Sequence, residues 1–275
     1  MKTLLLMALA LTGLTYRGQM KLAEREKCSP KHKLEVTFVA NEGVLISDGK
    51  KSVLIDGLFR KYKDLYGFLP PEQLQSLEQA RMPFDRIDLV LATHVHYDHF
   101  HPQSVGQHLK HNKKTHFIGT RQAGDELQQN FAAYEQISDR VRVAQPAWKQ
   151  KLSFKPAQIP VTVLGMRHGN KRFRDIQSLG FIVELGGKRL LHVGDADTTL
   201  ENFSAFDWEK ESIDIAFVPY WMLSNEDNVI TKLVKPKHIM ALHIPPSQAR
   251  EEAKKLEDVL PHVIVVTKKL HRIRF

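Results

Sequence analysis

The feature that most constrains this chain is a short apolar run that leads directly into a group of histidines. Residues 89–92 read Leu-Val-Leu-Ala, which is typical of a buried strand, and His94, His96, Asp98 and His99 follow at once. Alternate side chains of an extended segment point the same way, so His94 and His96 can converge on one point. Asp98 and His99 lie on the turn that follows and can serve a second point.

Imidazole and carboxylate groups are ligands that zinc, iron and manganese accept. The segment therefore predicts a metal site at the end of a buried strand. The alternative is a polar loop at a strand end that is merely rich in histidine.

The motif Thr-His-Val-His-Tyr-Asp-His at residues 93–99 resembles the signature of the metallo-β-lactamase fold superfamily, a large group of mostly hydrolytic enzymes with dinuclear metal centres. Three later segments match the remaining ligands of that family in chain order. They supply a histidine after a strand, an aspartate that bridges the metals and a last histidine after a late strand: His168, Asp195 and His243. The resemblance covers roughly residues 34–275.

The resemblance implies two divalent metal ions, with zinc expected and manganese or iron as alternatives. One ion would have the ligands His94, His96 and His168; the other would have Asp98, His99 and His243; Asp195 would bridge them. Two such ions share a water, lower its pKa towards neutrality and present it as a bridging hydroxide. Asp98, the expected catalytic residue, would orient this hydroxide. Asp56 would hold a ligand in place or, alternatively, only end a strand, and Asp197 is a further candidate for such a supporting role.

Composition and the N-terminus indicate how the chain is organised. A length of 275 residues with 42% hydrophobic and 26% charged residues is typical of a globular protein, with one large domain or two small ones. Lys2 and the short apolar run that follows it fit a secretory signal and are too short to span a bilayer. We expect a signal peptide at 1–15, a linker at 16–33 and the metallo-β-lactamase-like domain at 34–275. The protein would then be periplasmic or secreted; if the N-terminus is only an amphipathic or frayed segment, it would be cytoplasmic.

The pattern of apolar residues and turn residues predicts a mixed α/β fold. Strands are expected at 34–40, 44–56 (a hairpin with Asp48-Gly49 at its tip), 89–92, 115–119, 178–184, 189–193, 213–218, 238–242 and 263–266, with further short strands between 141 and 164 and an extended tail to Phe275. Helices are expected at 71–80, 102–110, 121–134, 227–234 and 247–257. The resemblance implies that these elements form a four-layer αββα sandwich of two mixed β-sheets with outer helices.

Charge and aromatic residues bear on the substrate. The formal net charge is +9, and four basic residues beside His168 are candidates for binding phosphate, or alternatively form an exposed charged loop: Arg167, Lys171, Arg172 and Arg174. The aromatic loop at 59–68 is expected in the core, with a position bordering the active site as the alternative. His101 and His108 are expected as a helix cap and a surface residue, and His192 as a strand residue.

We therefore expect a dinuclear metal-dependent hydrolase that acts on an anionic small molecule or lipid, either a phosphodiester or a cyclic ester (lactone). The chain is most similar to lactonase-like and N-acyl-phosphatidylethanolamine phospholipase D-like members, although His101-Pro102 departs from the latter. A nucleic-acid partner is not expected, because the large inserted domain of nucleolytic relatives has no counterpart. The alternatives are a di-iron redox protein on the same fold and a non-catalytic metal-binding protein. The sequence carries no signal for an oligomeric state.

Overall fold

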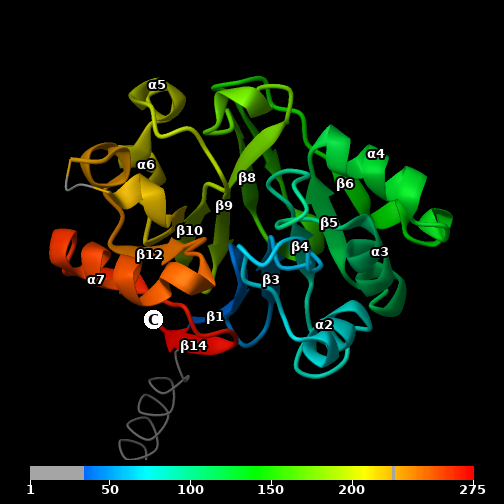
Figure 1. Cartoon of the computed structure of the whole chain (residues 1–275). Helices are drawn as coiled ribbons and strands as arrows, with labels where there is room; N and C mark the ends of the chain where they lie inside the picture. Colours follow the sequence, from blue (N-terminus) through cyan, green and yellow to red (C-terminus); the bar gives the residue numbers. More distant parts are fainter. Residues whose placement is uncertain (1–33, 225–226) are drawn as a thin grey trace, which may run out of the picture. The chain divides into compact units, whose positions relative to one another are not determined.

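Two mixed β-sheets of seven strands each form the centre of the computed structural model, which describes residues 34–224 and 227–275 (Figure 1). The signal peptide expected at 1–15 and the linker expected at 16–33 lie outside the described residues. No helix within the described ranges is long and apolar enough to cross a bilayer.

The first sheet has the order β14-β1-β2-β3-β4-β5-β6. Its strands are β1 (Glu35–Ala40), β2 (Gly43–Ser47), β3 (Ser52–Ile55), β4 (Leu89–Leu91), β5 (His116–Gly119), β6 (Val141–Val143) and β14 (His271–Arg274). Pairing is antiparallel from β14 to β3 and parallel from β3 to β6. The β2–β3 hairpin turns at Asp48-Gly49 as predicted, with Gly49 at φ 84°. The extended tail predicted before Phe275 is β14, which pairs with β1 at the edge.

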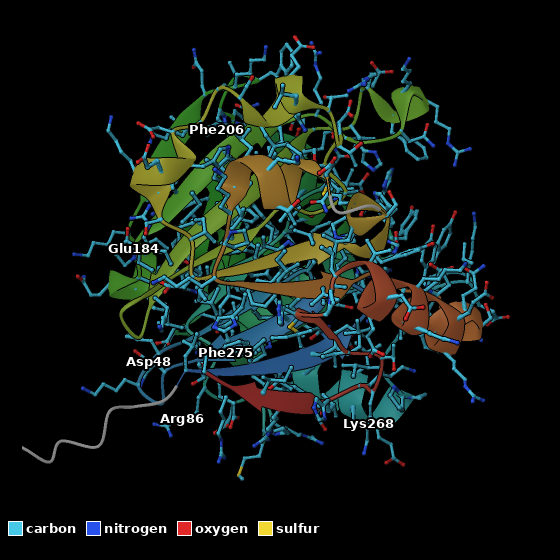
Figure 2. The ribbon with its side chains drawn as sticks, turned by 90° about the vertical axis from the view of Figure 1, so that its left-hand side faces the viewer. Asp48, Arg86, Glu184, Phe206, Lys268 and Phe275 are labelled. Carbon is cyan, nitrogen blue, oxygen red and sulfur yellow. The ribbon has the colours of Figure 1, made fainter. Side chains whose placement is uncertain are left out.

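The second sheet has the order β13-β12-β11-β10-β9-β8-β7. Its strands are β7 (Lys151–Phe154), β8 (Val161–Met166), β9 (Ser178–Leu185), β10 (Lys188–His192), β11 (Ile215–Pro219), β12 (His238–Leu242) and β13 (Val263–Val265). Pairing is antiparallel from β7 to β10 and parallel from β10 to β13. In β9 all residues are buried except Glu184, whose side chain points away from the molecule in Figure 2.

Side-chain alternation along the strands separates the core into layers. In β4, Leu89 and Leu91 lie between the two sheets, whereas Val90 faces the outer layer. In β11, Phe217 likewise lies between the sheets and Val218 faces outward. Because successive residues of a strand point to opposite faces, each sheet buries both of its faces.

Helices cover the outer face of each sheet (Figure 1). The helices on the first sheet are α2 (Pro71–Glu78), α3 (Pro102–His111) and α4 (Arg121–Asn130), and those on the second are α5 (Leu200–Phe203), α6 (Trp208–Glu211) and α7 (Ala249–Val259). The predicted four-layer αββα sandwich is therefore confirmed. Pro71 and Pro102 occupy the first turns of their helices, where the missing N–H costs nothing.

Some local predictions were wrong. The helix expected at 227–234 is only a five-residue π-helical segment, Ile230–Val234, and the short helices α5 and α6 were not predicted. His108, expected at the surface, is fully buried, and its Nδ1–H donates to the carbonyl of Leu77 at 2.6 Å. This bond ties α3 to α2, and burial lowers the pKa of His108 to about 4.

Candidate metal centre

The residues of the candidate site all follow strands that end at one edge of the sandwich. β3 and β4 are parallel neighbours, so Asp56 after β3 lies beside the segment 94–99 after β4. In the second sheet β8, β10 and β12 run in the same direction. Their C-terminal ends carry, in order, His168, Asp195 and His243. The carboxyl ends of parallel strands are the usual position of a site in an α/β sheet.

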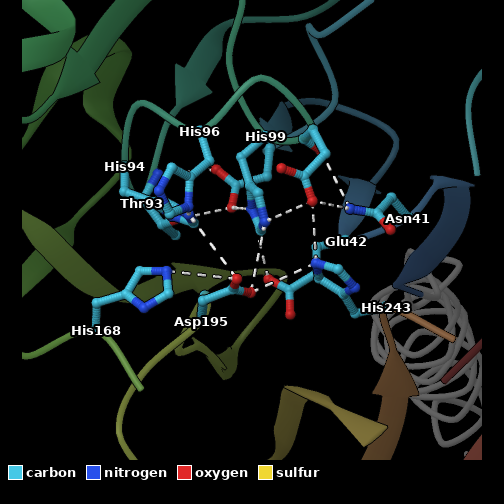
Figure 3. A network of polar contacts seen from close by, with 12 residues as sticks. Asn41, Glu42, Thr93, His94, His96, His99, His168, Asp195 and His243 are labelled. Atoms are coloured by element: carbon cyan, nitrogen blue, oxygen red, sulfur yellow. Dashed lines mark hydrogen bonds and ion pairs between the residues drawn. The ribbon is translucent and has the colours of Figure 1, made fainter. Parts of the chain in front are cut away.

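The structure brings the seven predicted ligands together in two groups (Figure 3). In the first group, the candidate ligand atoms of four residues lie within 4.8 Å of one another: His94, His96, His168 and Asp195. The second group, by the same measure, consists of Asp98, His99 and His243. These are the two sets that the resemblance implied.

Asp195 lies between the groups and divides its two oxygens between them. Oδ2 is 4.0 Å from Nε2 of His94 and 3.6 Å from Nε2 of His168. Oδ1 is 3.5 Å from Nε2 of His99 and 3.6 Å from Nε2 of His243. A carboxylate placed in this way can bridge two cations.

The donor atoms fit divalent cations. Among the described residues, the buried Nε2 atoms of His99 and His168 and the buried Oδ1 of Asp195 have no hydrogen-bond partner. Buried polar atoms are normally satisfied, so atoms left unpaired around one point indicate a ligand. Nε2 of His94 is 3.0 Å from Nδ1 of His96, near the roughly 3.3 Å expected between two ligands of a tetrahedral ion with metal–nitrogen bonds of about 2.0–2.1 Å.

Asp56 orients His94 and His99 through contacts on the side of their rings that faces away from the centre. Its Oδ1 accepts from the backbone N–H of Thr93 at 2.8 Å, and its Oδ2 accepts from the Thr93 hydroxyl at 2.5 Å. The same Oδ2 is 2.9 Å from Nδ1 of His99, and the Thr93 hydroxyl is 2.9 Å from Nδ1 of His94. With both Nδ1 atoms engaged, the Nε2 atoms of His94 and His99 face the centre, the arrangement that metal-binding histidines commonly show.

Burial and charge set the protonation of the cluster. Burial and the neighbouring imidazoles lower the pKa of His94, and burial lowers the pKa of His168 to about 4. Burial alone would raise the pKa of Asp98, but the imidazoles of His99 and His243 hold it below its ordinary range. These groups are therefore neutral imidazoles and an ionised carboxylate, the forms that bind metals.

His99 behaves differently because carboxylates surround it. Burial would lower its pKa, but Asp195, Asp98 and the bond to Asp56 raise it well above the ordinary value. Without a cation the carboxylates thus retain a proton on His99, which a metal ion would displace.

A pocket of about 720 Å³ opens onto the centre. Its base includes His168, Asp195 and His243, and its walls are two basic residues and four aromatic rings: Lys171, Arg172, Tyr66, Phe173, Tyr220 and Trp221. The ring of Trp221 is 4.9 Å from that of His243, and the ring of Phe173 is 4.5 Å from that of His96. Part of the aromatic loop at 59–68, expected in the core, therefore borders the pocket: Tyr66 lines it, and Tyr62 is about half exposed.

Only two of the four basic residues predicted near His168 face this pocket. Arg167 stacks on Trp148, with its guanidinium carbon 3.2 Å from the ring centroid. Arg174 pairs with Asp197 at 2.8 Å and donates to the carbonyl of His168 at 3.3 Å. The ion pair between Arg174 and Asp197 therefore stabilises the loop that carries His168. Of the four basic residues, only Lys171 and Arg172 line the pocket.

Sequence reasoning missed several residues at the site. Trp221 follows β11, the strand between β10 and β12, so the parallel order of this sheet was a usable signal for it. Asn41 donates from Nδ2 to Oδ2 of Asp98 at 3.2 Å, and Glu42 is fully buried with its Oε2 3.8 Å from Nδ1 of His99. Both belong to a turn between two strands, and nothing in their sequence context distinguishes them from ordinary turn residues.

Fold and site together define the class of protein: a metal-dependent hydrolase of the metallo-β-lactamase fold with a histidine–aspartate cluster able to hold metal. Residues 51–266, more than half of the chain, match the family model of the β-lactamase superfamily domain. The chain belongs to this superfamily, as the sequence motifs predicted.

Relatives and solved structures agree with this assignment. A UPF0173 metal-dependent hydrolase from Thermus thermophilus is 27% identical over 236 residues, which cover 80% of this chain and 89% of that protein. A UPF0173 metal-dependent hydrolase from Pyrococcus furiosus is 26% identical over 250 residues, covering 85% and 96%. The crystal structure of a possible metal-dependent hydrolase from Veillonella parvula shares the fold with a TM-score of 0.61 at 17% identity, covering 88% of this chain and 99% of that one.

Proposed function

We propose that this protein is a dinuclear metal-dependent hydrolase that cleaves an anionic ester, either a phosphodiester or a lactone. The observation that carries the proposal is the position of Asp195, whose two oxygens face two separate groups of ligand atoms. A single-metal site would need no such division.

Two divalent cations in these groups, most simply zinc, would supply a hydroxide near neutral pH and polarise the electrophilic oxygen of the substrate. His94, His96 and His168 would hold one cation, and Asp98, His99 and His243 the other. This assignment rests on the grouping of their ligand atoms and on the buried atoms left unpaired there.

Asp98 would orient the attacking water. Its Oδ2 accepts from Asn41 and lies 3.2 Å from Nε2 of His243, so the carboxylate is fixed in one direction. Its low pKa keeps it ionised, which makes Asp98 a hydrogen-bond acceptor rather than a strong base.

The pocket walls would bind the rest of the substrate. Lys171 and Arg172 offer charge-assisted donors to an anionic group beside His168. Tyr66 and Trp221 flank His243 with their rings and would exclude water from the reacting bond. Burial and the neighbouring Asp98 and Asp195 raise the pKa of Tyr66, so its hydroxyl remains a donor.

Hydrolysis assays test the proposal. We expect chelator-stripped protein to be inactive, and zinc to restore turnover of bis-p-nitrophenyl phosphate or of a member of a lactone panel. His96→Ala should abolish this turnover, whereas His111→Ala, a change in an exposed helix residue, should preserve it. The absence of metal-dependent turnover on both substrate classes would contradict the proposal. Native protein that contains iron and shows ligand-to-metal absorption bands would contradict the zinc assignment.

A further inference from the structure

Glu42 is a buried carboxyl group that the ligand sets above do not use. It lies in the turn between β1 and β2 and is 0% exposed. Neither of its side-chain oxygens has a hydrogen-bond partner among the described residues. Nδ1 of His99 lies 3.8 Å from Oε2 of Glu42, but Asp56 already occupies that nitrogen at 2.9 Å.

Such a residue is hard to explain by its contribution to folding. A buried carboxylate without a partner is strongly unfavourable, and a neutral carboxyl left without a hydrogen bond is also unfavourable. Glu211 shows how a glutamate supports this fold: it is 6% exposed and pairs with both Lys151 and Arg189. Among the described residues Glu42 pairs with no lysine or arginine, and the nearby His99 is already shared by Asp56, Asp98 and Asp195, so Glu42 lacks a counter-charge of its own.

The metal centre would supply this counter-charge. Glu42 forms a group with His99 and Asp195 in which the candidate ligand atoms lie within 4.8 Å of one another. Figure 3 places Glu42 beside Asp195 and His99, on the side of the centre that also carries His243. Four carboxylates then surround the imidazoles: Glu42, Asp56, Asp98 and Asp195. The carboxylate of Glu42 therefore adds negative charge beside the group that would hold the second cation.

We propose that Glu42 is the fourth carboxylate of the metal centre and supplies the negative charge that allows the second cation to bind at Asp98, His99 and His243. The proposal rests on the dinuclear site proposed above. Glu42 acts through His99 and Asp195, so it is a positioning residue rather than a catalytic one.

Metal titration combined with unfolding tests the role of Glu42. Wild type, Glu42→Gln and the matched control Glu211→Gln are stripped with a chelator and titrated with Zn²⁺ in competition with a chromophoric chelator. We expect wild type and Glu211→Gln to bind two equivalents equally. Glu42→Gln should bind the first equivalent with wild-type affinity and the second about 10- to 100-fold more weakly, the usual effect of removing a group that supports metal ligands.

Urea unfolding of the metal-free proteins separates this role from a structural one. Metal-free Glu42→Gln should unfold at the wild-type urea midpoint or above it, whereas Glu211→Gln, which breaks two ion pairs, should unfold at a lower midpoint. Wild-type affinities for both equivalents in Glu42→Gln would overturn the proposal. So would a lowered midpoint of metal-free Glu42→Gln together with weakening of both sites. Wild-type protein that binds fewer than two equivalents of Zn²⁺ would overturn the dinuclear site itself, and with it the role of Glu42. The titration of wild type alone reveals this outcome, so it is distinguished from a failure of the Glu42 proposal only.

Discussion

Asp56→Asn is the substitution that most sharply tests how the ligands are oriented. The change keeps the shape of the side chain but replaces one carboxylate oxygen with an amide NH₂. If the remaining oxygen still accepts from the backbone of Thr93, the amide faces the Thr93 hydroxyl and Nδ1 of His99. His99 must then accept at Nδ1 and carry its proton on Nε2, the nitrogen that points to the centre. The variant should therefore hold His99 in the wrong tautomer for binding metal.

The size of the effect follows from the lost contacts. One charge-assisted hydrogen bond is worth about 1.5–3 kcal/mol, and loss of a partner of a metal ligand usually weakens metal binding about 10- to 100-fold. Such a loss in affinity corresponds to about 1.4–2.8 kcal/mol, in the same range. We expect the affinity for the second Zn²⁺ and kcat/KM to fall together by this factor.

The assay is competitive Zn²⁺ titration with parallel hydrolysis measurements, and Asp88→Asn is the matched control. Asp88 also accepts from a backbone N–H of the same sheet, that of Ser52 at 2.9 Å, and pairs with Lys51, but it lies before β4 rather than after β3. The control should lose some stability and keep wild-type metal affinity. An Asp56→Asn protein that binds two Zn²⁺ within twofold of wild type would refute the orienting role.

Three further outcomes are expected. Neutralising Lys171 and Arg172 together should raise KM for an anionic substrate about tenfold with little change in kcat, whereas Arg167→Gln, which removes a guanidinium stacked away from the pocket, should leave both unchanged. The pKa of His108 is about 4 in the folded protein and 6.5 in the unfolded chain. The contribution of neutral His108 to stability is therefore complete above pH 6.5 and is lost as the pH falls towards 4. The free energy of unfolding should fall by about 3 kcal/mol over this range. Urea unfolding of His108→Gln should therefore vary less between pH 7 and 4 than that of wild type, and parallel curves would contradict this. Chelation should lower the thermal midpoint, since a free ion at a hundred times its Kd stabilises a fold by about 2.7 kcal/mol; an unchanged midpoint would contradict binding to the folded state.

Much of the fold and site could be predicted because the signals are local. The motif at residues 93–99 places three imidazoles and a carboxylate at the end of one strand, and Asp195 and His243 each follow an apolar run of their own. Alternation along β4 and the Asp48-Gly49 turn are likewise readable within a few residues. The structure brings the four side chains of this motif together with His168, Asp195 and His243, which the resemblance to the superfamily supplied.

The remainder depends on contacts between distant segments. His192 donates from Nε2 to the carbonyl of Glu42 across 150 positions of sequence, a bond that holds the turn carrying Glu42 under the site. Arg174 faces Asp197 rather than the pocket because the loop after β8 folds back onto the loop after β10. His108 is buried because α3 packs against α2. None of these pairings follows from periodicity or from the neighbours of each residue in the chain.

X-ray absorption of the zinc-loaded protein tests the central claim most directly. The division of the Asp195 oxygens between two groups of ligand atoms predicts two zinc ions per chain, each with nitrogen and oxygen neighbours, separated by about 3.5–4 Å. A single zinc per chain, or two without a metal–metal contribution at that distance, would contradict the dinuclear centre.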